Sequence, residues 1–372
     1  MDEPAAHPRF SVVVPCYNYG HFLPACVASV LDQDVEVEIV VVEDRSTDSS
    51  GEVADALAAQ DGRVRVLHNE VNLGLIGTAN RGLAEARGEF LVLLSADDLL
   101  APGALARAER LFDADPAVGL VYGDVELFED EVPPRRPDAT PRWYVWPGRR
   151  WARIVARTAD NPISSPEAIV RRDVLDAVGP YRAEFPHTSD LKYWLESAQH
   201  ADVARIAGPV AAYYRRHGDN MSAVHFGEPL VDATERLRAF DSSDTGPTAW
   251  DARAARRAVA HHFLWMSLVL SGTSEDGRSE HYRTWATEID SRRRFLVMCR
   301  VTDAFRPGHG PRLVPKVAPK LAGARWRVRR TLGRARWRLG ARRVVRQPVT
   351  TPGGSASRPA APAVDERRTA RG

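Results

Sequence analysis

The sequence predicts an α/β protein built on a doubly wound, mostly parallel sheet with helices on both faces. Short apolar runs rich in β-branched residues recur at 10–14, 39–42, 64–67, 89–94 and 118–122. Between them, apolar residues recur at the three- and four-residue spacing of amphipathic helices, at 21–31, 51–60, 75–86 and 104–112. This alternation is typical of parallel strands joined by right-handed crossovers.

The second half of the chain predicts further elements in the same way. From 129 to 147 the prolines, charges and tryptophans predict a long loop or lid. The expected helices and strands after it are a helix at 151–156, a strand at 165–170, helices at 172–178 and 189–200, strands at 203–206 and 210–214, and helices at 228–240, 250–270 and 282–300.

Four segments follow from this pattern and from composition. They are an α/β domain at 1–226, a helical appendage at 227–305, a proline-broken linker with a basic helix at 306–346, and a disordered tail at 347–372. The length suits one large or two modest domains.

Composition and charge narrow the class of protein. Three cysteines without CxxC spacing exclude a disulfide framework or a zinc site and fit a reducing compartment. No signal peptide or membrane-spanning run is visible, so we expect a cytoplasmic protein. The net charge of +2 conceals thirteen Arg or Lys and no Asp or Glu at 312–346. We therefore expect residues 321–346 to contact an anionic membrane surface, and regard nucleic acid as the less favoured partner.

An apolar run at 91–94 leads into two adjacent carboxylates, Asp97 and Asp98. Unpaired carboxylates are costly to bury, so the pair should lie just past the strand, at the edge where ligands bind in open α/β sheets. Their oxygens suit Mg²⁺ or Mn²⁺. The alternative is a helix cap and a turn residue. Asp44 follows the second strand and should reach the same edge.

With these elements placed, the chain resembles the family-2 glycosyltransferases with the GT-A fold. The motifs that carry the resemblance are 12–19 (VVVPCYNY), 39–48 (IVVVEDRSTD), 72–74 (NLG) with Asn80 and Gly82, 93–98 (LLSADD), 178–181 (VGPY), 189–195 (SDLKYWL) and 214–222 (YRRHGDNMS). Four positions depart from the family pattern. Arg45 stands where Gly is usual, Glu43 replaces a common Asp, and Ser95 takes the first place of the usual Asp-x-Asp metal motif. Ser189 stands where Glu is more common.

The resemblance implies roles for particular residues. Asp190 would be the catalytic base. The donor would be bound by Pro15, Tyr17, Asn18, Glu43, Asp44, Asn80, Asp97 and His217, and the metal by Asp98, Asp97 and His217. A structural alternative stands beside each role, because Asp44 and Asp190 are also common helix caps and a lone His is usually structural. Trp143, Trp146 and Trp151 would either stack on an acceptor sugar or, as we favour, pack in the core.

The implied function is metal-assisted, inverting transfer of a sugar from a nucleotide-diphosphate donor. The acceptor would be a glycan, a lipid-linked sugar or a small molecule, in cell-surface or secondary-metabolite glycan synthesis. The rivals are a catalytically silent glycan- or membrane-binding protein and a sugar nucleotidyltransferase. The latter needs a Gly-rich, Arg-containing loop after the first strand, and residues 15–20 (PCYNYG) are not such a loop.

Overall fold

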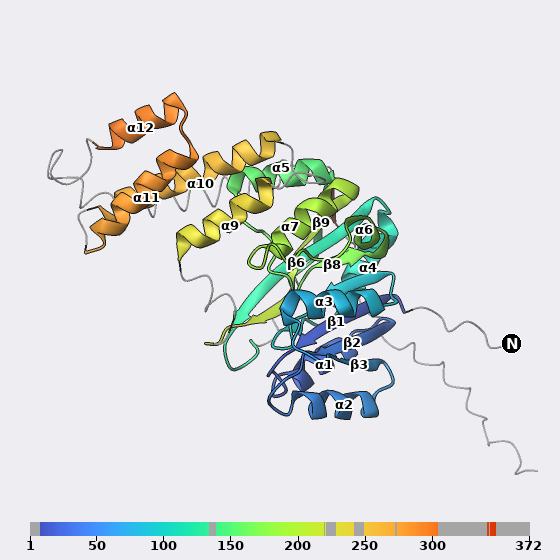
Figure 1. Ribbon diagram of the computed structural model, residues 1–372. Helices are drawn as coiled ribbons and strands as arrows, with labels where there is room; N and C mark the ends of the chain where they lie inside the picture. The colour runs from blue at the N-terminus through green and yellow to red at the C-terminus, as the bar shows by residue number, and fades with distance from the viewer. Residues whose placement is uncertain are drawn as a thin grey trace, which may run out of the picture.

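The computed structural model describes residues 8–133, 139–218, 220, 228–241, 249–271, 274–303, 341 and 343–346. In this part of the chain, strands form one ten-stranded sheet in the order β10-β7-β9-β6-β8-β4-β1-β2-β3, with β5 paired to β9 off this path. Helices lie on both faces of the sheet, and a group of C-terminal helices extends from one end (Figure 1). The predicted GT-A-like α/β layout is therefore confirmed.

The strands divide into a parallel half and a mixed half. The parallel half consists of β1 (Phe10–Cys16), β2 (Val37–Glu43), β3 (Val64–His68) and β4 (Phe90–Leu93). The mixed half consists of β5 (Leu99–Leu100), β6 (Val118–Phe128), β7 (Arg142–Trp146), β8 (Ile169–Arg171), β9 (Asp202–Arg215) and β10 (Arg343–Arg346). β8 runs antiparallel to both β4 and β6, while β9 is parallel to β6.

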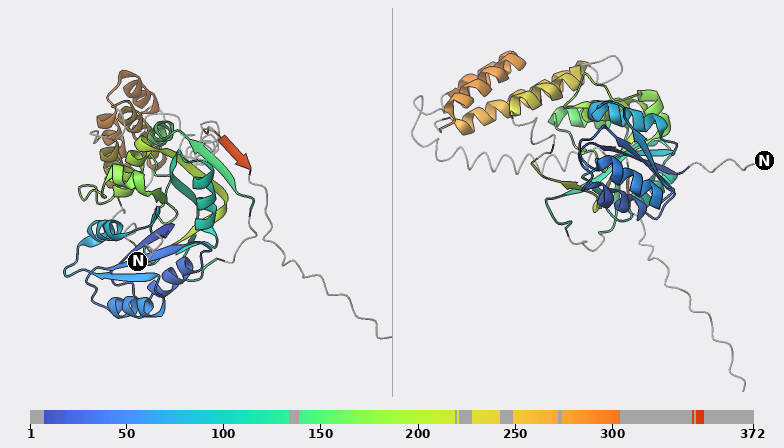
Figure 2. Two further views of the ribbon diagram at one scale, coloured as in Figure 1. Left: turned by 90° about the vertical axis from the view of Figure 1, so that its right-hand side faces the viewer. Right: turned by 60° about the horizontal axis from the view of Figure 1, so that its bottom comes forward.

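Each face of the sheet has its own helices. One face carries α1 (Leu23–Leu31), α2 (Ser50–Gln60) and α4 (Ala104–Ala114). The other carries α3 (Gly74–Glu85), α5 (Gly148–Thr158), α6 (Arg172–Val178) and α7 (Ser189–His200). Beyond them lie α9 (Pro229–Asp241), α10 (Ala249–Leu270), α11 (Asp276–Ile289) and α12 (Arg293–Asp303) (Figures 1 and 2).

The period-two alternation of β1 explains the two hydrophobic cores. Val12 and Val14 point into the core beneath α1 and α4, while Val13 points into the core beneath α3. All seven residues of β1 and of β2 are buried, as expected for central parallel strands. On α3, a Cβ at Gly82 would come within 2.3 Å of Val13 Cγ1. This close approach brings the C-terminal half of α3 against β1 and β2.

The C-terminal helices share the second of these cores. Buried side chains of α9, α10 and α11 belong to the same hydrophobic cluster as Trp151 of α5 and Trp194 of α7. α9 and α10 lie beside α7 and α5 (Figure 1). The predicted helical appendage thus exists, and the domain limits themselves stay a prediction.

Several predicted element boundaries were wrong. The expected loop at 129–147 contains β7, because its aromatic run is buried and pairs with β9. Pro15 does not end the first strand, which continues to Cys16. Of the predicted strand at 165–170, only residues 169 and 170 are extended, as part of β8, and Ser165 adopts a positive φ of 85°.

Three further differences concern continuity. The two strands expected at 203–206 and 210–214 are one irregular strand, β9, in which Gly208 takes a φ of 115°. The helix expected at 282–300 is two helices, broken where Asp290 accepts a hydrogen bond from the Arg292 amide. At the end of the predicted basic helix, Arg343–Arg346 is a strand paired with β7. The rest of that helix, apart from Ala341, lies outside the described residues, as do the linker and the 347–372 tail.

Candidate active site

The carboxyl ends of the parallel strands meet at one edge of the sheet. Asn18 follows β1, Asp44 follows β2, and Asp97 and Asp98 follow β4. Because β8 runs antiparallel to β4, the residues before β8 reach this edge as well. β9 runs parallel to β6 and hence to β4, so the residues after it, including His217, lie there too.

Asp44 is buried and held by the loop that follows β3. Its Oδ1 accepts hydrogen bonds from Asn69 Nδ2 at 2.6 Å and from the Leu73 amide at 2.7 Å. Asn69 Nδ2 also lies 3.1 Å from Thr78 Oγ1 on α3. Asp44 does not cap a helix in this arrangement. Two donors on a single oxygen fix the carboxylate and orient Oδ2 for another partner.

The acidic loop after β2 is tied to the loop after β1. The Asn18 amide donates to Ser46 Oγ at 3.1 Å, and the Thr47 amide donates to Asn18 Oδ1 at 2.8 Å. Asn18 and Arg45 both adopt left-handed backbone conformations, with φ of 57° and 60°. Arg45 thus occupies a conformation that glycine adopts without strain, which explains why the related family usually has Gly there.

Glu43 faces the backbone of this loop and the end of β3. Its Oε1 accepts the Ser46 amide at 2.5 Å, and its Oε2 lies 3.5 Å from His68 Nδ1. Burial acts to raise the pKa of Glu43, but the hydrogen bonds from Ser46 and His68 outweigh it, and the pKa is lowered. Glu43 therefore supports the loop that carries Asp44.

Asp97 and Asp98 are nearly fully buried and are held mainly by the end of β9. Asp97 Oδ2 lies 2.9 Å from His217 Nε2 and 3.3 Å from Asn220 Nδ2. Asp98 Oδ1 accepts the Arg215 amide at 2.9 Å. The structure therefore brings together the Asp pair and His217, which lie about 120 residues apart in the sequence.

The Asp pair has capacity to bind a cation. Asp97 Oδ1 is buried and makes no hydrogen bond within the described chain. Burial and the adjacent charge of Asp97 raise the pKa of Asp98 well above its usual range. A divalent cation would relieve this repulsion. Among the described residues, no group of three or more His, Cys, Asp or Glu side chains forms a complete metal cage.

Arg215, the last residue of β9, packs beside the Asp pair. Its guanidinium carbon lies 4.5 Å and 4.3 Å from the ring centres of Phe22 and Phe128. Its Nε donates to the Asp97 carbonyl at 3.0 Å, and Nη1 donates to the Glu129 carbonyl at 3.1 Å. Stacked between two rings, it secures the backbone that presents Asp97.

Asp190, in the first turn of α7, is half-buried and strongly hydrogen-bonded. Its Oδ2 accepts Asn161 Nδ2 at 2.7 Å and lies 3.5 Å from Ser165 Oγ. Its Oδ1 accepts the amide of Leu191 at 2.7 Å. Burial raises the pKa of Asp190, and these three hydrogen bonds offset part of the increase. A carboxylate with a raised pKa is suited to accept a proton.

Other predicted site residues lie elsewhere or make structural contacts. Asn80 Nδ2 donates to the Tyr181 carbonyl, and the Tyr181 amide donates to Asn80 Oδ1, both at 2.8 Å, which joins α3 to the turn before α7. Pro15 is buried within β1, whereas Tyr17 is 45% exposed beside the site. The three tryptophans, Trp143, Trp146 and Trp151, are buried in the core, as we favoured.

Four site residues were missed by sequence reasoning. Asn69, Asn161, Ser165 and Glu167 all lie in segments that approach Asp44 or Asp190. The signal available for Asn161 and Ser165 was a cluster of turn formers at 160–166 (DNPISSP), which ends directly before Glu167. The predicted strand at 165–170 included residues 165 and 166, so the turn was not predicted.

A mixed sheet with helices on both faces and carboxylates gathered at its carboxyl edge is the arrangement expected of the GT-A fold. The family model described as "Glycosyl transferase family 2" matches residues 11–179. The chain belongs to this family, the family-2 glycosyltransferases. The family match ends before Asp190 and His217.

Individual relatives support the assignment. Glycosyltransferase GlyG of Streptococcus pneumoniae is 41% identical over 119 residues, covering 30% of this chain and 38% of its own. An uncharacterized protein of Mycobacterium tuberculosis is 30% identical over 231 residues, covering 57% and 68%. A PGL/p-HBAD biosynthesis glycosyltransferase of Mycobacterium bovis is 35% identical over 122 residues, covering 32% and 48%. The chain thus matches well under half of GlyG.

Among solved structures, residues 1–349 of S. aureus TarS in complex with UDP-GlcNAc share the fold. The TM-score is 0.56 at 17% sequence identity, covering 84% of this chain and 92% of that one. The same TarS segment without a named ligand gives a TM-score of 0.54 at 18% identity. The likeness extends over the sheet and into the C-terminal half of this chain.

Proposed function

We propose that this protein transfers a sugar from a nucleotide-diphosphate donor to an acceptor hydroxyl with inversion, using Asp190 as the base. The observation that carries the proposal is the environment of Asp190. This side chain is half-buried, its pKa is raised, and each of its two carboxylate oxygens accepts a hydrogen bond. Asp190 lies in the first turn of α7, whereas the Asp pair follows β4, so different elements would supply the base and the donor-binding carboxylates.

In this proposal, Asp190 removes the proton from the acceptor hydroxyl. The freed oxygen attacks the anomeric carbon from the side opposite the diphosphate. As the new C–O bond forms, the bond to the diphosphate oxygen breaks, and the nucleoside diphosphate leaves with the electron pair. Asp44 Oδ2 would accept a hydrogen bond from the base or ribose, with Asn18 and Glu43 keeping the loop in place.

Asp97 and Asp98 fit a bound Mg²⁺ or Mn²⁺. Magnesium sites commonly use one or two carboxylates together with substrate phosphates, and Asp97 Oδ1 offers an oxygen with no other partner in the described chain. The ion would neutralise charge on the leaving diphosphate. Because His217 Nε2 forms a hydrogen bond with Asp97 Oδ2, we propose that His217 orients that carboxylate.

The donor and acceptor classes are proposed from the relatives and the solved structures. TarS was solved with UDP-GlcNAc, so uridine-diphosphate sugars are the first donors to test. Relatives include a PGL/p-HBAD biosynthesis enzyme, which supports a glycan or lipid-linked acceptor of the cell surface or of secondary metabolism. No helix in the described residues is long and apolar enough to cross a membrane. We propose that the basic segment 321–346 binds an anionic membrane at its cytoplasmic face.

The test is a panel of nucleotide sugars incubated with the protein and Mn²⁺ or Mg²⁺. One donor should be hydrolysed slowly or transferred, and that donor should also protect the protein against thermal unfolding. Asp190→Asn should lower turnover at least about 1,000-fold while leaving donor affinity within about twofold, since an amide cannot accept the proton. Thr188→Ser, next to the base but retaining its hydroxyl, is the matched control.

Two outcomes would contradict the proposal. If no donor in the panel binds or reacts, the protein is a glycan- or membrane-binding relative without transfer activity. If Asp190→Asn keeps its turnover, another group acts as the base.

A further inference from the structure

Glu167 is a buried carboxylate to which the proposed reaction gives no role. It is 4% exposed and lies two residues before β8. Its Oε1 accepts the Ser164 amide at 2.8 Å, whereas Oε2 is buried without a hydrogen bond in the described chain. Burying a carboxylate with an unpaired oxygen costs free energy, so its presence calls for a compensating role.

Glu167 lies in a tight turn at 165–168, and its side chain accepts a hydrogen bond from the residue just before that turn. The Ala168 amide donates to the Ser165 carbonyl at 2.9 Å, with Pro166 at the position where proline favours a turn. The bond from Ser164 to Glu167 Oε1 fixes the same turn on its other side. Between these two bonds, Ser165 is held at a φ of 85°, a strained conformation for a residue other than glycine.

The strained turn faces the proposed base. Ser165 Oγ lies 3.5 Å from Asp190 Oδ2, and Asn161 Nδ2, four residues earlier, donates to the same oxygen at 2.7 Å. Asn161 is itself oriented by the Ile163 amide, which lies 3.3 Å from Asn161 Oδ1. The segment 161–168 therefore holds one of the two oxygens of the Asp190 carboxylate, while the Leu191 amide holds the other.

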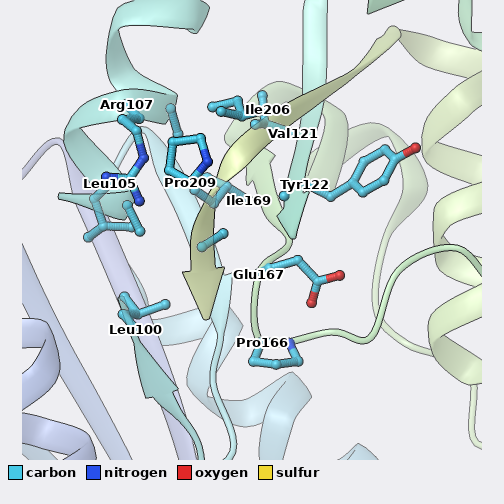
Figure 3. Close-up of a pocket in the computed structure, with 14 residues that line it drawn as sticks. Leu100, Leu105, Arg107, Val121, Tyr122, Pro166, Glu167, Ile169, Ile206 and Pro209 are labelled. Atoms are coloured by element: carbon cyan, nitrogen blue, oxygen red, sulfur yellow. The ribbon is translucent and has the colours of Figure 1, made fainter. Parts of the chain in front are cut away.

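The surroundings of Glu167 exclude direct substrate binding there. Glu167 and Tyr122 line a small cavity bounded by α4, β6, β8 and β9 (Figure 3). Its volume of about 20 Å³ has room for one water molecule but not for a sugar. Burial raises the pKa of Glu167 to about 7, and the charges of Asp190 and Asp124 contribute to the increase. Glu167 is thus near Asp190 but enclosed.

We propose that Glu167 is a positioning residue for the base: it fixes the 164–168 turn, which holds Ser165 and Asn161 against Asp190. The inference rests on the proposed role of Asp190. A misplacement of about 1 Å in a reacting group can reduce the rate about 100-fold, so a support of this kind affects turnover without touching substrate.

The test compares Glu167→Ala with Glu167→Gln, using the nucleotide sugar that gives turnover in the donor panel. Glu167→Ala should lower kcat at least about tenfold and leave donor KM and UDP affinity within about twofold, because the donor contacts are elsewhere. Glu167→Gln keeps a carbonyl oxygen for the Ser164 amide and should restore most of kcat. Equal kcat for wild type and Glu167→Ala would overturn the proposal.

A matched control separates positioning from general destabilisation. Glu38 is equally buried at 4% exposed, and accepts hydrogen bonds from Ser11 and Arg87 at the opposite end of β2. Glu38→Ala should reduce stability without changing kcat at a temperature where it is folded. A kcat loss in Glu38→Ala equal to that in Glu167→Ala would show that destabilisation alone is responsible.

Asn161→Ala gives an independent measurement if Glu167→Ala does not fold. Removing a donor to the ionised carboxylate raises the pKa of Asp190, so the acidic limb of the kcat profile should move to higher pH. An unmoved limb would contradict the arrangement. If Asp190→Asn abolishes turnover and these variants do not change kcat, this inference alone fails; if Asp190→Asn retains turnover, the proposed base is wrong.

Discussion

At the scale of single residues, Arg45 shows how a departure from a family pattern is accommodated. Its φ of 60° costs an L-residue about 1 kcal/mol, and its side chain is exposed. We predict that Arg45→Gly raises the free energy of unfolding by about 0.5 kcal/mol, since relief of strain exceeds the added entropy of the unfolded chain. Urea denaturation measures it. Arg45→Ala keeps the strain, and an equal gain in that variant would refute the explanation.

Glu167 gives a second prediction at this scale, on stability and pH. Its pKa is about 7 in the folded protein and about 4.5 in the unfolded chain, so the folded state binds the proton more tightly. Ionisation of Glu167 should therefore lower the free energy of unfolding as the pH rises above about 4.5. The loss should be complete above about pH 7 and reach about 3 kcal/mol. The stability of Glu167→Gln relative to wild type should increase between pH 5 and pH 8 in urea denaturation. A difference independent of pH would contradict the shift.

The sequence identified the residues whose chemistry is visible from their position after a strand. Asp44, Asp97 and Asp98 follow apolar runs, and parallel topology brings their strand ends to one edge. Asn161 and Glu167 could not be found this way, because their relation to Asp190 depends on β8 running antiparallel and on a strained turn. Neither feature has a periodic signal in the sequence.

At the scale of elements, strands were likewise predictable only where the local sequence carries a signal for them. The central strands were predictable because burial on both faces gives continuous apolar runs. β7 was hidden by the prolines around it, and its pairing with β9 is a long-range contact that the local sequence does not encode. β9 was divided at Gly208-Pro209, where the structure has an irregularity in one strand.

Asn80 provides the prediction for this scale, since it joins α3 to the turn before α7. Its two hydrogen bonds satisfy the amide and the carbonyl of buried Tyr181. Asn80→Ala should leave both unsatisfied and lower the free energy of unfolding by about 2 kcal/mol in urea denaturation. Donor KM should stay within about twofold. A large increase in KM with unchanged stability would instead place Asn80 in the donor site, as the family resemblance implies.

At the scale of the whole molecule, β10 joins the chain's C-terminal part to the sheet. Arg343–Arg346 pairs antiparallel with Arg142–Trp146, so β10 covers the backbone edge of β7. An uncovered strand edge is a template for pairing with another chain. The basic composition of 312–346 also places this edge strand within the segment that we propose binds anionic membranes.

Two truncations test these roles, each role by its own measurement. A chain ending at residue 311 loses β10 and the basic segment, so it should self-associate through the uncovered β7, as measured by light scattering after size exclusion. It should also lose binding to phosphatidylserine-containing vesicles, because about 1 kcal/mol of attraction per basic residue is removed. A chain ending at residue 346 keeps both features and should behave like the full chain. A monodisperse 311-residue chain would show that β10 does not protect the edge, and unchanged vesicle binding would show that the basic segment is not the membrane contact.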